Sequence, residues 1–193
     1  IRLGMANPNF ILKYVDELIP IFKNKKMFKF LHIPVQSGND EVLKNMNRKY
    51  HAKDWIEIVE KFRAEIPNIT IATDIICGFP EETEKQFRDT IYLIEKYEPD
   101  VVNRSKFWKR PGTPAAKMKQ TPGFDIKKRS SWLSNSFRWV SFQKNKKWIN
   151  WKGEILIDEK GKDNSWIGRN NSYKQVIVKG DYSLGQKRAI EIK

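Results

Sequence analysis

Short apolar runs alternate with stretches of helical periodicity over the first 108 residues, and this pattern limits the folds open to the chain. Residues 28–35, 69–77 and 101–108 have the character of buried strands. Between the first two runs, residues 54–66 place apolar side chains at helical spacing, and Pro67 follows them. Strand and helix in turn at this spacing predict βαβ units around a parallel sheet, an α/β fold.

The remaining N-terminal signals refine this prediction. Residues 2–5 have the character of the end of a further strand, which brings the expected number of strands to four. A helix is expected after Asn7, and Pro20 is expected to kink it or end it early. Thr83 and Gln86 form a capping-box pattern ahead of another helix. The chain is therefore expected to be a piece of a larger sheet or barrel.

The pattern changes after residue 110. Residues 111–123 are rich in Gly, Pro, Thr and Lys and predict a loop, and residues 125–148 predict a basic helix. Short strand patterns separated by turns then predict a small all-β barrel, with strands at 154–158, 173–179 and 188–193. The predicted organisation is an α/β part at 1–124, a connecting helix at 125–149 and a β domain at 150–193.

Charge and aromatic residues are concentrated in the second part of the chain. Lys and Arg total 37 against 23 Asp and Glu, a net charge of +14. Residues 126–193 hold 16 of the basic and 6 of the acidic residues, and five of the seven tryptophans. This combination favours binding to a phosphate backbone and unstacked bases. A solubilising surface over core tryptophans explains the same composition equally well.

Two absences narrow the classes of protein further. Cys77 is the only cysteine, so an intrachain disulfide is excluded. One cysteine and two histidines cannot supply four ligands for a zinc or iron–sulfur centre. No apolar run reaches the roughly 20 residues that a membrane span needs, and we expect a protein of the cytoplasm with no membrane partner.

Three polar and glycine-containing segments each follow a predicted strand: LHIPVQSGND at 31–40, TDIICGFPEET at 73–83 and RPGTPAAKM at 110–118. Ligands bind at the carboxyl ends of parallel strands, where the connecting loops converge. Gly38 and Gly78 would let a ligand approach the backbone closely. From the residues alone, the segments predict a cleft for a polar ligand the size of a nucleoside.

These segments resemble the second half of the radical S-adenosylmethionine methylthiotransferases, enzymes that attach a methylthio group to an adenosine of tRNA or to a ribosomal-protein aspartate. The sequences GEILI at 153–157 and IGRN at 167–170 are similar to the TRAM domain of that family, a small RNA-binding β-barrel. The resemblance implies a partial β/α (TIM-like) barrel followed by a TRAM barrel. IRLGMANP at 1–8 is most similar to the archaeal and eukaryotic branch, which acts on N6-threonylcarbamoyladenosine beside the anticodon.

The resemblance implies a site for S-adenosylmethionine and a surface for the anticodon stem-loop of tRNA. The S-adenosylmethionine side of the site would comprise Gln36, Ser37, Asp74, Gly78, Glu82 and Arg110. The RNA-binding residues would be Lys152, Arg169, Lys174, Lys179, Lys187 and Arg188.

Structural explanations compete for several of these residues. Gln36 and Ser37 could form a turn that caps the next helix, and Glu82 could stabilise a helix N-terminus. Arg110 could form an ordinary ion pair. His32, in an apolar strand, is more simply a hydrogen-bonded core residue than a base.

One departure from the family pattern bears on catalysis. The cysteines that hold the two [4Fe–4S] clusters of the family have no counterpart here, and Cys77 matches none of them. The resemblance therefore implies no metal ligand and no catalytic residue in this chain, which would need the N-terminal remainder of the same enzyme. A non-catalytic RNA-binding protein, and a methylthiotransferase acting on another tRNA base or on a ribosomal protein, remain alternatives.

Overall fold

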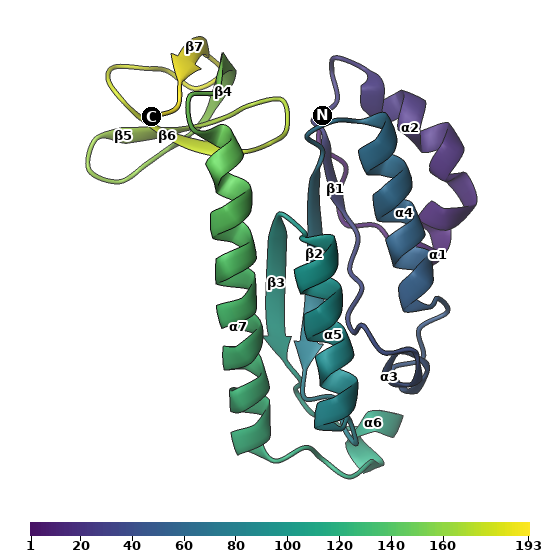
Figure 1. Ribbon diagram of the computed structural model, residues 1–193. Coiled ribbons are helices and arrows are strands. Elements are labelled where there is room, and N and C mark those ends of the chain that lie inside the picture. The colour runs from purple at the N-terminus through teal and green to yellow at the C-terminus, as the bar shows by residue number, and fades with distance from the viewer.

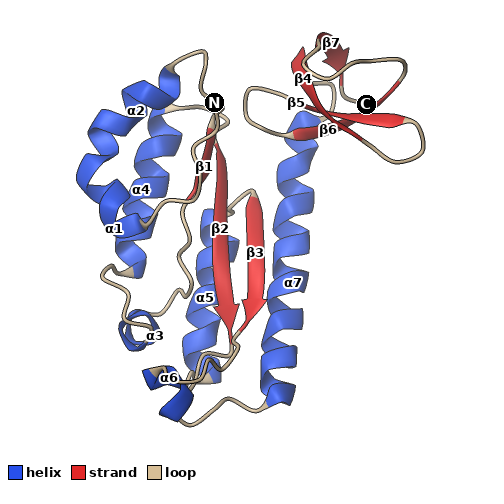
Figure 2. Cartoon of the chain, turned by 180° about the vertical axis from the view of Figure 1, so that it is seen from behind, coloured by secondary structure: helices blue, strands red, loops and turns tan.

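A computed structural model describes all residues from Ile1 to Lys193. Its first part is built on a three-stranded parallel sheet in the order β1 (Phe30–His32), β2 (Thr70–Cys77) and β3 (Val101–Lys106). The helices cover one face of this sheet, and Figure 2 shows the other face uncovered. The parallel α/β arrangement expected from the alternating pattern is confirmed.

The helices of this part lie before, between and after the three strands in the sequence (Figure 1). They are α1 (Pro8–Ile11), the 3-10 turn η1 (Leu12–Tyr14), α2 (Val15–Lys23), α3 (Asp40–Asn45), α4 (Ala52–Glu65), α5 (Glu84–Tyr97) and α6 (Pro114–Lys117). The capping box of Thr83 and Gln86 is formed at the start of α5, as predicted. No helix of the chain is both long enough and apolar enough to cross a membrane.

The core lies between the sheet and these helices. Ile71, Ile75 and Cys77 of β2 are fully buried in this core, together with the aromatic side chains of Trp55 and Phe62. Each fully buried aliphatic side chain of this size stabilises the fold by roughly 1.5–3 kcal/mol. Because side chains alternate along a strand, the residues between them face the uncovered side of the sheet, Asp74 among them.

Two local predictions were wrong. Residues 2–5 form no strand, and only Met5 makes an isolated parallel bridge, to His32. Pro20 lies inside α2, and the helix continues to Lys23, so the early end expected at Pro20 is wrong. Proline has no N–H to donate to the carbonyl of Asp16, one turn earlier in the helix. Pro20 and Asp16 are both exposed, so this carbonyl can tilt toward water while Ile19 and Phe22 remain buried.

The long helix α7 (Gly123–Asn145) connects the two ends of the molecule. It begins near the carboxyl ends of the strands, where Thr121 donates a hydrogen bond to the Phe79 carbonyl, 2.9 Å away. At the other end Lys144 pairs with Asp100, just before β3, at 3.1 Å. The predicted basic helix is confirmed, and it ends in the 3-10 turn η2 (Lys146–Trp148).

The C-terminal part is a curled antiparallel sheet of four strands. These are β4 (Lys152–Lys160), β5 (Ser165–Arg169), β6 (Gln175–Lys179) and β7 (Lys187–Glu191), in the order β6-β5-β4-β7. The three predicted strands are confirmed, and β5 was not among them. The predicted closed barrel is not formed, because β6 and β7 are edge strands that do not pair with each other. Figure 1 shows this sheet at the amino-terminal end of the parallel strands, opposite the end where they finish.

Candidate functional site: a cleft at the carboxyl ends of the strands

A cleft of about 480 Å³ lies where the three parallel strands end. Its charged and amide side chains come from four separate parts of the sequence: Gln36, Arg48, Asp74, and the stretch that holds Lys106 and Arg110. Three of these, Gln36, Asp74 and Arg110, belong to the site predicted from the sequence. The fold therefore brings half of the predicted residues into one cavity, at the edge where parallel β/α folds bind ligands.

Gln36 is held in the cleft by its own backbone. Its N–H donates to the Asp74 carbonyl at 2.8 Å, and its carbonyl accepts from Ile76 at 3.0 Å, so the line of β1 continues beside β2. Its φ of 69° lies in the left-handed region, which non-glycine residues seldom occupy. Strained backbone of this kind persists where the surrounding structure enforces it, commonly at binding sites.

Asp74 forms the centre of a polar trio on the uncovered face of the sheet. Its Oδ1 lies 2.8 Å from His32 Nε2 and accepts a hydrogen bond from the Asn103 side chain at 2.9 Å. His32 is thus a hydrogen-bonded residue of its strand, which agrees with the simpler of the two interpretations. Oδ2 of Asp74 has no partner within the chain, so it can accept a hydrogen bond from a hydroxyl or amino group in the cleft.

Two arginines contribute positive charge to the cleft, in addition to Lys106. Arg48 is a residue that the sequence analysis missed, and its Nε is buried without a hydrogen-bond partner. Arg110 is exposed and forms no ion pair, so the alternative of an ordinary salt bridge is wrong for this residue. Two guanidinium groups without carboxylate partners suit an anionic group on a ligand, such as a carboxylate.

Ser37 and the two glycines serve packing within the protein. The Ser37 side chain is fully buried, and its hydroxyl accepts from the Asn39 N–H at the start of α3. A Cβ on Gly38 would lie 2.6 Å from the Asp89 carbonyl oxygen of α5, and one on Gly78 would lie 2.4 Å from Ile126. The close approach predicted for a ligand at these glycines is made instead by α5 and α7, which corrects that interpretation.

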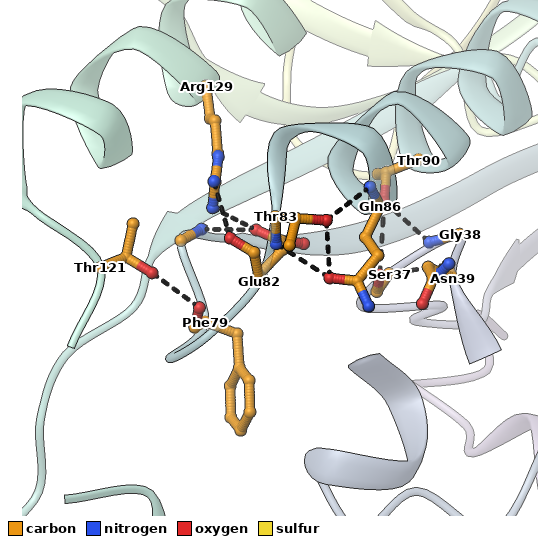
Figure 3. Close-up of polar contacts among 11 residues, drawn as sticks. Ser37, Gly38, Asn39, Phe79, Glu82, Thr83, Gln86, Thr90, Thr121 and Arg129 are labelled. Carbon is orange, nitrogen blue, oxygen red and sulfur yellow. Dashed lines mark hydrogen bonds and ion pairs between the residues drawn. The ribbon is translucent and has the colours of Figure 1, made fainter. Parts of the chain in front are cut away.

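Glu82 lies away from the cleft, in contact with α7 (Figure 3). Its Oε2 accepts from Arg129 Nη1 at 3.0 Å and from the Gly78 N–H at 3.2 Å, and the side chain is fully buried. Burial raises the pKa of Glu82 to about 7, although Arg129 and the Gly78 amide act in the opposite direction. Its Oε1 is buried without a partner. In this structure Glu82 joins α7 to the parallel sheet.

Cys77 does not fit an iron–sulfur cluster. It is fully buried in the helix-covered layer, and burial raises the pKa of its thiol to about 12. Cluster ligands are thiolates, and no group of three or more Cys, His, Asp and Glu gathers anywhere in the chain. The residues of this chain therefore cannot hold the cluster that the resemblance implies.

The six predicted RNA-binding residues lie on or beside the C-terminal sheet but differ in their availability. Three of them are engaged in ion pairs within the sheet: Lys152 with Glu191, Arg169 with Asp158 and Lys187 with Glu154. Lys174 is half-buried, and burial lowers its pKa. Lys179 and Arg188 are exposed and form no ion pair, which leaves them free to contact phosphate.

Comparison with known proteins agrees with this geometry. Residues 1–94 match the sequence model of the Radical SAM superfamily. The structure resembles coproporphyrinogen III oxidase from Escherichia coli with a TM-score of 0.52 at 24% identity, over 68% of this chain and 31% of that one. The sequence match and the fold thus define a β/α unit of the radical SAM class.

The sequence is also similar to curated relatives of narrower description. A probable threonylcarbamoyladenosine tRNA methylthiotransferase from Pyrococcus abyssi is 43% identical over the whole chain, which covers 45% of that protein. The human threonylcarbamoyladenosine tRNA methylthiotransferase is 40% identical, again over the whole chain, which covers 33% of it. The chain belongs to this methylthiotransferase family, and it spans less than half the length of the curated relatives it matches.

Proposed function

We propose that this chain supplies the S-adenosylmethionine cleft and an RNA-binding surface of a methylthiotransferase that acts on N6-threonylcarbamoyladenosine in cytoplasmic tRNA. The observation that carries the proposal is the convergence of Gln36, Asp74 and Arg110 in one cleft. The relatives of this chain are named threonylcarbamoyladenosine tRNA methylthiotransferases. The three segments come from positions up to 74 residues apart, so local sequence constraints do not explain their meeting.

The cleft fits the polar parts of S-adenosylmethionine. Oδ2 of Asp74 and the Gln36 side chain would accept or donate hydrogen bonds to hydroxyl and amino groups. Arg48, whose Nε is an orphaned buried donor, and Arg110 would bind the carboxylate. When bound, S-adenosylmethionine supplies the methyl group and, after one-electron reduction, the radical; the reducing cluster would be held outside this chain, because Cys77 does not fit one.

The RNA would bind through the C-terminal part. We propose that residues 150–193 correspond to a TRAM domain and that residues 1–124 and 125–149 form the barrel part and the connecting helix. The support is the curled antiparallel sheet with its free cations Lys179 and Arg188. Phosphate contacts by lysine and arginine supply most of the affinity in binding of this kind.

The test is a titration of the chain with S-adenosylmethionine, followed residue by residue by NMR. We expect weak binding, with Kd on the order of 0.1–1 mM, because the cluster that would chelate the methionine end is absent. Shifts should centre on Gln36, Arg48, Asp74 and Arg110. Asp74→Ala should weaken binding, whereas Lys117→Ala, an exposed residue of α6 outside the cleft, should not. Shifts confined to other regions would contradict the assignment.

A further inference from the structure

A groove of about 330 Å³ separates β3 from α7, apart from the cofactor cleft. Its apolar lining is formed by Val102, Leu133 and Phe137. Its polar lining comprises Arg104, Ser134, Arg138 and Ser141. No acidic residue lines it. The groove follows the free edge of the parallel sheet, since β3 pairs only with β2.

The two arginines in this groove have no carboxylate partner. Arg104 is fixed in place by hydrogen bonds to the Ser130 carbonyl, at 2.9 Å, and to the Ser134 hydroxyl. Arg138 forms neither a hydrogen bond nor an ion pair with the rest of the chain. Two like charges beside one groove repel each other, and an anion bound between them would remove that repulsion and engage both guanidinium groups.

The position of the groove indicates which anion it suits. The 23 residues of α7 span about 35 Å, from the cofactor cleft to the C-terminal sheet, and the groove lies along this path. Directly after Arg138, α7 exposes two aromatic rings, Trp139 at 58% and Phe142 at 62%, with the Lys146 ammonium 4.9 Å from the Phe142 ring. Free cations next to exposed rings are the combination that binds phosphates and stacks unpaired bases.

We propose that the groove between β3 and α7 binds a backbone phosphate of an RNA strand, through Arg104 and Arg138, as that strand passes from the C-terminal sheet to the cleft. The inference rests on the proposed function, because it takes RNA to be the substrate. It adds a third contact region, on the connecting helix, and explains how one RNA reaches two sites at opposite ends of the molecule.

The experiment measures binding of a labelled anticodon stem-loop to the whole chain by fluorescence anisotropy at several salt concentrations. Arg138→Gln should lower the affinity roughly fivefold and reduce the slope of log affinity against log salt by about 0.7–0.9, the loss of one phosphate contact. Arg138→Lys should keep the slope, because it keeps the charge. Lys13→Gln removes the same charge from an exposed position on η1, between α1 and α2, and should change neither quantity. Figure 1 shows α1 and α2 beyond β1, at the opposite edge of the parallel sheet from α7.

The outcomes separate this inference from the function on which it rests. If Arg138→Gln binds like Lys13→Gln while Lys179→Glu weakens binding, the groove is not a phosphate site and the proposed RNA-binding function stands. If the unaltered chain binds RNA without salt dependence, the proposed function itself fails. A polyglutamate peptide that displaces RNA from the chain but not from Arg138→Gln would show that the groove takes acidic protein segments, and would overturn the inference.

Discussion

The carboxylate of Glu82 lies 3.0 Å from the guanidinium of Arg129, and both side chains are almost entirely excluded from solvent. This pair joins the start of α5 to α7 and so holds the connecting helix against the parallel sheet (Figure 3). Removing one partner of a buried pair leaves an uncompensated charge, which typically costs about 3–5 kcal/mol. The pair is therefore expected to contribute to holding the first turns of α7 in place.

This buried carboxyl should make the stability depend on pH. The pKa of Glu82 is raised to about 7 in the folded chain, so the folded state binds the proton more tightly than the unfolded state. The resulting stabilisation is fully present below about pH 4 and is lost as the pH rises through 7, by about 1 kcal/mol per pH unit. Urea unfolding between pH 5 and 8 should show this slope in the parent chain and a smaller decline in Glu82→Gln. Equal slopes in the two proteins would contradict the assignment.

Gly38 should be required for the packing of α5. Gly38→Ala places a Cβ against the backbone of Asp89, which cannot move as a flexible side chain would, and we expect a loss of about 1–3 kcal/mol. Gly4→Ala is the matched control, since nothing lies within 4 Å of the added carbon. Thermal unfolding followed by circular dichroism compares the two, and equal melting temperatures would show that α5 moves aside without cost.

Cys77 should be chemically inert in the folded chain. Its thiol is fully buried and its pKa is raised to about 12, so the reactive thiolate is scarce at neutral pH. A thiol reagent at pH 8 should label it only after unfolding in urea. Reconstitution with iron and sulfide should give no chromophore stoichiometric with the chain. Rapid labelling without denaturant would mean that the strand carrying Cys77 opens readily.

If the C-terminal sheet binds RNA as proposed, the cations without acidic partners should contribute most to the affinity. The double variant Lys179→Glu and Arg188→Glu adds repulsion at two free positions and should lower both tRNA affinity and its salt dependence. Lys152→Gln removes a cation already paired with Glu191 and should have a smaller effect. Unchanged affinity in the double variant would move the binding to α7.

The parts of the fold that follow from local pattern were predictable. The run from Ile69 to Cys77 is rich in β-branched residues, and the structure makes it the central strand β2. The capping box at Thr83 was predictable for the same reason, because its two partners are three residues apart. That the C-terminal sheet stays open was not predictable. Closure into a barrel depends on pairing between β6 and β7, which no local pattern specifies.

The site was predictable only where its residues carry polar groups at strand ends. Gln36 and Arg110 follow strands, Asp74 lies in the second half of β2, and all three line the cleft. Arg48 does not meet this condition, since it follows the short helix α3 and no spacing marks its return to the cleft. Gly78 was assigned to a ligand because the residue that fills its space, Ile126, is 48 positions away in the sequence.

The most direct test of the proposed function is methylthio transfer by a chimera. The segment of the Pyrococcus abyssi relative that aligns with this chain would be replaced by the chain, leaving the rest of that protein in place. We predict that the chimera converts N6-threonylcarbamoyladenosine in tRNA to its methylthio derivative, detected by mass spectrometry of the digested RNA, and that Asp74→Ala abolishes the product. A folded chimera that carries its clusters but forms no product, beside an active parent relative, would contradict the account.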